Sequence, residues 1–213
     1  TIEIKQICQY DWDTLKLMKR SGNHLMWFGA EAATEETQNL IRKAIKEGQT
    51  DEAMRRMHEL DIKSGLTYII GYPDETVDSM YETIYQAAEM KTRYPSCSVE
   101  VFPYRPIPGS QFWEPSVENG YPVPESFEDW GRCFDYKFNS WWGPVPPEVQ
   151  KVWARFTQMA PWFDGLAGGR GPYSHLLRKT AGLRLRKRYW TAPVEFKVFD
   201  VIRRSFGPVS KYV

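Results

Sequence analysis

The sequence predicts an α/β fold in which about four parallel strands alternate with helices, followed by a mostly helical region rich in aromatic residues and proline. Two observations lead to this prediction. Over residues 1–110, short apolar runs alternate with amphipathic stretches, the pattern of strand–helix units around a parallel sheet. From residue 111 onward that alternation fades, while tryptophan and proline become frequent. We therefore expect three regions, at 1–110, 111–172 and 173–213.

Four apolar runs are the expected strands. The first is weak, whereas the other three are short, nearly continuous apolar runs of the kind found in buried parallel strands. The four runs cover residues 2–8, 24–28, 66–71 and 98–102.

The stretches between these runs carry helix signals. Asp11 or Asp13 begins a helix that Ser21-Gly22-Asn23 stops, and Thr34-Glu35-Glu36 suits the N-terminus of another. Further helices are expected at about 51–63 with Thr50 as cap, at a stretch with Val77, Met80, Ile84 and Ala87 on one face, at 148–163, and twice beyond residue 173 with a break near Pro193. A glycine-rich loop is expected at 165–171.

Composition limits the classes of protein to consider. The chain is 42% hydrophobic and 26% charged, with a mean hydropathy of −0.55, as in water-soluble folded proteins, and no apolar run approaches the roughly 18 residues of a membrane span. Cys8, Cys97 and Cys133 are odd in number and far apart, which predicts neither a disulfide framework nor a metal site. The three histidines have no partner at helical or strand spacing. We therefore expect a reduced, cytoplasmic setting and no metal-ligating residue.

Charge is distributed unevenly along the chain. Residues 176–213 hold ten Lys and Arg against two acidic residues, a net of +8, whereas 1–175 hold 18 basic and 25 acidic residues, a net of −7. The segment 183–190 also mixes cations with large apolar side chains. Such a tail could contact an anionic membrane peripherally, the acidic face of the protein, or, less in keeping with the rest of the sequence, nucleic acid.

Polar groups gather where three of the expected strands end. Function collects at the carboxyl ends of parallel strands, and here those ends carry Glu31, Gly71 and Tyr104-Arg105. Glu31 could accept hydrogen bonds from an ammonium or hydroxyl group, and Gly71 could let a flat ring approach the backbone. Each also has a structural interpretation, since an acid favours a helix N-terminus and Gly71-Tyr72-Pro73 suits a turn with Asp74 as the cap of the next helix.

The order and wording of these pieces resemble a known family. The runs Trp27-Phe28-Gly29-Ala30-Glu31, Leu40-Ile41-Arg42-Lys43, Gly71-Tyr72-Pro73-Asp74-Glu75-Thr76 and Tyr104-Arg105-Pro106-Ile107-Pro108-Gly109-Ser110 are similar to the second half of a radical S-adenosylmethionine barrel. The likeness is greatest to its cobalamin-binding class, which includes the anaerobic magnesium-protoporphyrin monomethyl ester cyclases. The resemblance covers about residues 1–125 and implies the C-terminal half of a partial (β/α)6 barrel.

The resemblance also implies roles for individual residues. Glu31 would contact S-adenosylmethionine near its ribose or methionyl part, and Lys43 would face its carboxylate, with Arg42 the neighbouring candidate. Ile70 and Gly71 would flank the adenine, and Tyr104 and Arg105 would lie near the adenine or the substrate. These residues are cofactor contacts, and no catalytic residue is assigned.

One feature of that family is absent from the sequence. The family holds a four-iron four-sulfur cluster with three closely spaced cysteines, and no such triplet occurs here. We therefore expect the C-terminal part of a longer enzyme, whose missing N-terminal part carries the cluster and possibly cobalamin. The implied activity is a radical cyclisation or methylation of a small, apolar or tetrapyrrole-like substrate. Two alternatives are a non-catalytic module that docks on an anionic membrane or nucleic acid through its tail, and part of a tRNA-modifying methylthiotransferase.

Overall fold

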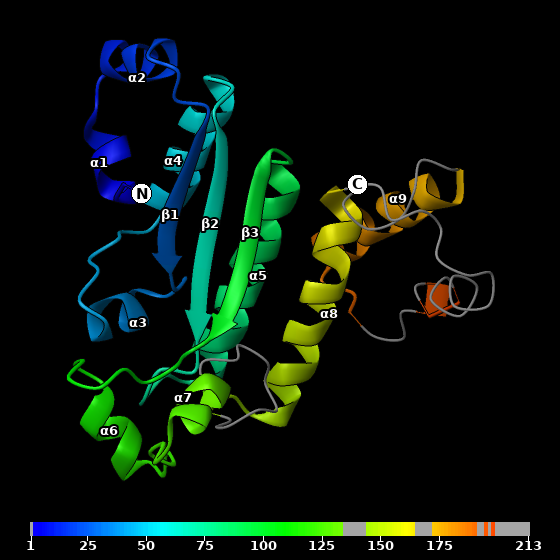
Figure 1. Cartoon of the computed structure of the whole chain (residues 1–213). Coiled ribbons are helices and arrows are strands. Elements are labelled where there is room, and N and C mark those ends of the chain that lie inside the picture. The colour runs from blue at the N-terminus through cyan, green and yellow to red at the C-terminus, as the bar shows by residue number, and fades with distance from the viewer. Residues whose placement is uncertain (1, 134–143, 165–171, 191–193, 196, 199–213) are drawn as a thin grey trace.

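A three-stranded parallel sheet with helices on one side forms the N-terminal part of the molecule (Figure 1). The computed structural model describes residues 2–133, 144–164, 172–190, 194–195 and 197–198. The strand order is β1-β2-β3, with strands Leu25–Glu31 (β1), Lys63–Ile70 (β2) and Cys97–Pro103 (β3). The helices are Ile4–Gln9 (α1), Trp12–Arg20 (α2), Glu35–Leu40 (α3), Gln49–Glu59 (α4), Val77–Arg93 (α5), Trp113–Glu118 (α6), Phe127–Cys133 (α7), Pro147–Asp164 (α8) and Pro172–Lys187 (α9). The expected α/β class with a helical C-terminal region is confirmed.

The weak strand expected at 2–8 is a helix, so that prediction was wrong and three of the four expected strands form in the described residues. Ile4 and Ile7 are both buried, and their spacing of three places them on one face of α1. That face packs against α4 beside β1. The apolar alternation that suggests a strand is thus satisfied by a short helix whose two isoleucines enter the core.

The segment before β2 differs from the prediction in its boundaries. The helix expected at 51–63 is α4, which begins two residues earlier with Gly48 in the left-handed region (φ 79°) as its N-cap, so Thr50 lies inside the helix. Lys63, the expected last residue of that helix, is instead the first residue of β2, which continues through Ser64 and Gly65. Gly65 is required there, because a side-chain carbon at this position would lie 2.4 Å from the indole ring of Trp27 on the neighbouring strand. The other strands extend the predicted runs by a few residues.

The sheet has one covered and one open face in the described part of the chain. Met26, Phe28 and Ala30 alternate along β1 with buried side chains and join the core formed with α4 and α5, which lie behind the sheet in Figure 1. The intervening residues Leu25 and Trp27 are 49% and 37% exposed. Since parallel sheets are normally covered on both faces, an open face is an unusual feature for a complete domain.

The sheet edge at β3 is closed by α8, which the sequence predicts at 148–163. The indole N–H of Trp153 donates to the backbone carbonyl of Val101 over 2.7 Å, so a helix side chain takes one carbonyl that a fourth strand would otherwise use. Trp190, beyond α9, packs against Phe156 of α8 and Tyr85 of α5. Together, α9 and Trp190 are therefore docked on α5 and α8.

The region expected at 111–172 begins with the two short helices α6 and α7, and residues 134–143 lie outside the described residues. The predicted loop at 165–171 and the predicted break at Pro193 also lie outside them. No helix among the described residues is long and apolar enough to cross a membrane.

Candidate functional site

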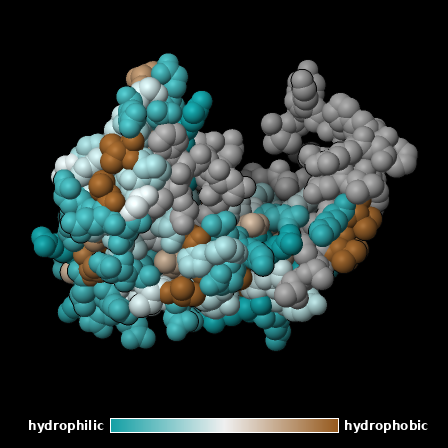
Figure 2. Space-filling view, turned by 90° about the horizontal axis from the view of Figure 1, so that it is seen from below, coloured by the Kyte–Doolittle hydropathy of each residue, from teal (hydrophilic) through white to brown (hydrophobic). Residues whose placement is uncertain are grey.

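Five of the six predicted cofactor contacts lie at the edge of the sheet where the strands end. Parallel pairing sets Glu31 opposite Tyr68 and Ile70 opposite Pro103, and the backbone N–H of Tyr104 donates to the carbonyl of Ile70 over 2.8 Å. The Lys43 side chain reaches the same edge from the loop after α3. Seen from the carboxyl ends of the strands, the molecule presents mostly hydrophilic residues with separate hydrophobic groups among them (Figure 2).

Glu31 is held in a strained turn at the end of β1. Its φ is 63°, in the left-handed region that a glutamate rarely adopts, and the N–H of Ala32 donates to the carbonyl of Ala30 over 2.8 Å across it. This is the positive-φ form of the γ-turn, which is rare and costs on the order of 1–3 kcal/mol. The buried Gln38 amide stabilises the turn by donating to the carbonyls of Ala30 and Ala32 at 2.7 and 2.5 Å.

The absence of a side chain at Gly29 allows the Glu31 carboxylate to fold back over β1. An added carbon at Gly29 would lie 2.2 Å from Oε1 of Glu31. The same oxygen accepts the Lys43 ammonium at 3.1 Å, and the two side chains, one partly buried and one exposed, form an ion pair. Both residues line a cavity of about 390 Å³ between β1 and the start of the chain, with Gly29, Ile45 and Thr67 also in its wall.

The loop after β2 is organised by Glu75. Its Oε2 accepts the N–H groups of Gly71 at 2.6 Å and Tyr72 at 3.2 Å, and its Oε1 accepts the hydroxyl of Ser79 at 3.1 Å. Burial raises the pKa of Glu75 from 4.5 to about 7, although the two backbone hydrogen bonds and that from Ser79 act in the opposite direction. Glu75 thereby fixes the loop that, by the family resemblance, would contact the adenine.

Gly71 adopts φ 86°, which explains why a glycine is required there. The space that a side chain would fill is occupied by Val145 and Pro144, at 2.8 and 3.0 Å from the added carbon. The expectation that a flat ring approaches bare backbone at Gly71 is therefore wrong for that side of the residue. Whether Gly71 contacts a cofactor through another side stays a prediction.

An aromatic cluster joins the ends of β2 and β3. The Tyr72 ring lies 4.9 Å from that of Tyr104 and 5.6 Å from that of Phe112, centre to centre. Burial raises the pKa of Tyr72, and the nearby carboxylates of Glu31 and Glu75 raise it further, so Tyr72 remains a neutral hydroxyl between the Glu31 and Tyr104 parts of the edge.

Arg105 is placed differently from the other five residues. It is 6% exposed, and its Nη1 donates to the carbonyl of Tyr104 over 3.1 Å. Its positive charge also lowers the pKa of Tyr121, which burial raises on balance. Arg105 thus lies beneath the edge, where it supports the residues after β3.

Sequence reasoning missed Gly29, Tyr72 and Glu75 as parts of this edge. The spacing of Gly29 and Glu31 offers a signal, because residues two apart on a strand share a face and only glycine leaves room there for the carboxylate. Glu75 follows Gly71 by four residues, and in the sequence it reads as an ordinary acidic residue before a helix.

The comparisons with known proteins are limited to part of the chain. A stretch of 104 residues, 49% of this chain, is 30% identical to part of an uncharacterized methyltransferase of Pyrococcus horikoshii. No family model matches the sequence. The matched stretch is 22% of the length of the Pyrococcus protein, so the chain spans about a fifth of that relative.

The residues at the edge differ in how well they suit the cofactors that the resemblance implies. A carboxylate and an ammonium group beside a cavity fit a zwitterionic ligand such as S-adenosylmethionine, whose amino acid part carries both complementary charges. They do not fit an iron–sulfur cluster. Within the described ranges no three His, Cys, Asp or Glu side chains group as metal ligands, and the thiols of Cys8, Cys97 and Cys133 contact Gln49, Met54 and Trp130 respectively.

Proposed function

We propose that this chain forms part of the S-adenosylmethionine pocket and of the substrate enclosure of a larger, methyltransferase-like enzyme. The observation that carries the proposal is the Glu31–Lys43 ion pair, held by a strained turn at the carboxyl edge of a parallel sheet. The relation to a protein named as a methyltransferase supports S-adenosylmethionine over other ligands.

Each residue at the edge has a role in this proposal. Lys43 pairs with the ligand carboxylate, and Glu31 accepts from its ammonium or ribose hydroxyl groups, so the ligand replaces the internal ion pair. The Tyr72–Tyr104–Phe112 cluster supplies an apolar wall that excludes water. S-adenosylmethionine, when bound, supplies a methyl group activated by its sulfonium centre.

The finer proposal places the enzyme among the radical S-adenosylmethionine proteins with cobalamin, acting on an apolar or tetrapyrrole-like substrate. Its cluster and cobalamin would be held by residues outside this chain. Between the two outcomes that the sequence resemblance leaves open, the named relative favours methylation over cyclisation. The open face of the sheet supports the same proposal, because the missing N-terminal part would cover Leu25 and Trp27 by completing a partial (β/α)6 barrel.

Binding of S-adenosylmethionine to the full-length protein tests the proposal. Isothermal titration calorimetry is expected to give a Kd that rises about tenfold in Lys43→Met, as the loss of a charge-assisted hydrogen bond of ~1.5 kcal/mol requires. Lys46→Met, three residues along the same loop, is the matched control and should bind as the wild type does. The proposal would be overturned if the wild type showed no measurable binding, or if the wild type and Lys43→Met bound with equal affinity.

A second candidate function is peripheral attachment to an anionic membrane through α9. Leu176 and Leu183, seven residues apart on one face, are both 57% exposed, and the exposed Lys179 and Lys187 lie beside them. Not every cation of this region is available, because Arg184 pairs with Glu195 and Arg188 lies 4.3 Å over the Tyr85 ring.

Co-sedimentation with vesicles tests the membrane proposal. Vesicles containing phosphatidylserine should bind the protein more than neutral vesicles do, and 1 M salt should release it. The double variant Leu176→Glu, Leu183→Glu should abolish binding, whereas Leu17→Glu, an equally exposed leucine on α2, should leave it unchanged. Equal sedimentation with both vesicle types would exclude this function.

A further inference from the structure

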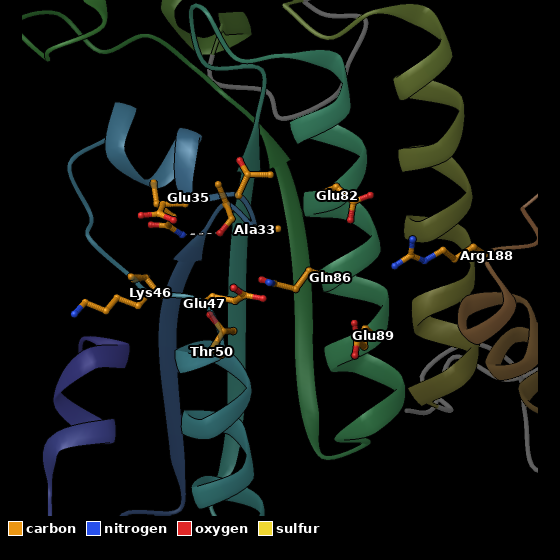
Figure 3. Close-up of a pocket in the computed structure, with 14 residues that line it drawn as sticks. Ala33, Glu35, Lys46, Glu47, Thr50, Glu82, Gln86, Glu89 and Arg188 are labelled. Atoms are coloured by element: carbon orange, nitrogen blue, oxygen red, sulfur yellow. Dashed lines mark hydrogen bonds between the residues drawn. The ribbon is translucent and has the colours of Figure 1, made fainter.

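A second cavity lies among the helices, beside the Glu31–Lys43 cavity. It measures about 280 Å³ and is enclosed by the turn after β1, the loop that leads into α4, and one face of α5 (Figure 3). Among the described residues, Ile45 is common to the walls of both cavities. We call this second cavity the outer cavity.

The wall of the outer cavity is predominantly acidic. It contains four glutamates against two cations, Lys46 and Arg188. One of the glutamates, Glu89, is already paired with Arg93 outside the wall, so the group as a whole carries a formal charge of −1. In Figure 3 the Lys46 side chain extends away from the cavity, and Glu47 and Gln86 extend toward each other across it. The four glutamates are Glu35, Glu47, Glu82 and Glu89.

The oxygen of a buried amide in the wall accepts no hydrogen bond. Gln38 is 3% exposed, and its Nε2 is committed to the carbonyls of Ala30 and Ala32. If the amide were flipped, its oxygen would face the carbonyl oxygens of Ala30 and Ala32. These two contacts therefore fix the orientation of the amide. Its Oε1 has no hydrogen-bond partner in the structure. A buried acceptor left unsatisfied costs about 1–3 kcal/mol, which a ligand that donates a proton would recover.

We propose that the outer cavity binds an organic cation through a primary ammonium group. An ammonium supplies three donors, enough to satisfy Gln38 Oε1 while pairing with carboxylates such as Glu47. The positive charge of the ammonium also balances the remaining formal charge of −1. A divalent metal is a poorer match, because no three metal-ligating side chains group within the described ranges.

Occupancy of the outer cavity is linked to the proposed cofactor edge through Gln38. The same amide whose oxygen lacks a partner in the wall of this cavity holds, with its nitrogen, the turn that carries Glu31. This link rests on the proposed function, whereas ammonium binding itself does not. The two can therefore fail separately.

Titration of the full chain with 1,4-diaminobutane tests the site, with sodium chloride of equal ionic strength as the reference. We expect saturable binding at one site. Its Kd should rise about fivefold in Glu47→Gln, the factor that corresponds to ~1 kcal/mol for one ion pair, and more in Gln38→Met. Glu36→Gln, an exposed residue of α3 outside the cavity wall, is the matched control and should bind as the wild type does.

A second arm distinguishes a free amine from a lysine side chain of a partner protein. Nα-acetyl-lysine methylamide should bind at the same site, and if it binds more tightly than the diamine the natural ligand is a protein lysine. Circular dichroism confirms that Gln38→Met is folded, and Glu47→Gln tests the site independently of that variant. Absence of saturation with both probes, or affinities unaltered in Glu47→Gln, would overturn the proposal.

Discussion

At the scale of single residues, the carboxyl edge depends on the missing side chain of Gly29. In Gly29→Ala the added carbon would lie 2.2 Å from Oε1 of Glu31, so the carboxylate must leave the Lys43 ammonium or the strand must shift. We expect a loss of ~1–3 kcal/mol in the free energy of unfolding, the usual cost of overpacking, and weaker S-adenosylmethionine binding.

Urea denaturation measures the first effect. Gly131→Ala is the control, because Gly131 lies in α7 with open space where its side chain would be. That variant should be neutral or slightly stabilised by the better helix propensity of alanine. Equal unfolding midpoints for Gly29→Ala and the wild type would show that Glu31 does not need the space over β1.

Glu75 makes the stability of the loop after β2 dependent on pH. Because its pKa in the folded chain is about 7, above the ordinary 4.5, the folded state holds the proton more tightly than the unfolded state. The contribution of Glu75 to the free energy of unfolding is therefore fully present below pH 4.5 and is lost as pH rises through 7. We expect the free energy of unfolding to fall by on the order of 1–2 kcal/mol between pH 5 and pH 8 on account of this group.

Glu75→Gln should remove that part of the pH dependence. A glutamine amide can still accept from Gly71 and Tyr72 with its oxygen and donate to Ser79 with its nitrogen, so the loop keeps its contacts. Glu36→Gln, at an exposed position, should retain the wild-type slope. Chemical denaturation at both pH values, followed by far-UV circular dichroism, gives the comparison, and an unchanged slope in Glu75→Gln would refute the assignment.

At the scale of elements, the Trp153 side chain ties α8 to the edge of the sheet. Trp153→Phe keeps most of the ring but removes the N–H that donates to Val101, which should cost ~1 kcal/mol. Trp12→Phe makes the same chemical change where the ring packs against the guanidinium groups of Arg55 and Arg56. It should cost less, because a phenyl ring retains that contact. Thermal unfolding of both variants decides whether the hydrogen bond matters.

The elements also show what the sequence can predict. The apolar runs inside β1, β2 and β3 are recognisable because strands of parallel sheets carry nearly continuous apolar sequence. This holds even for Leu25 and Trp27, which lie on the open face. The helix at Ile4–Gln9 cannot be recognised in this way, because two isoleucines three residues apart suit either a strand or a helix. The packing of this segment against α4 decides between the two. At the candidate site, Glu31 and Lys43 can be found by resemblance. The turn that strains Glu31, and Gln38 that holds it, depend on contacts between segments.

At the scale of the whole molecule, a substitution by lysine should be tolerated on one face of the sheet and not on the other. Leu25 is 49% exposed and Met26 is 7% exposed, although they are neighbours in β1. Leu25→Lys should change the free energy of unfolding of the 213-residue chain by less than ~0.5 kcal/mol. Met26→Lys buries an unpaired charge among α4 and α5 and should prevent folding. Far-UV circular dichroism of the two purified variants measures this contrast.

The same pair of variants tests the proposed larger enzyme. If a preceding part of the protein completes the barrel over the open face, Leu25 becomes buried there, and Leu25→Lys should lower the melting temperature of the full-length protein while leaving the 213-residue chain unaffected. Glu100→Gln, an exposed residue of β3 on the same face, removes a charge instead of adding one and should not be destabilising in either form. Equal tolerance of Leu25→Lys in both forms would mean that this face of the sheet remains open to solvent in the whole protein.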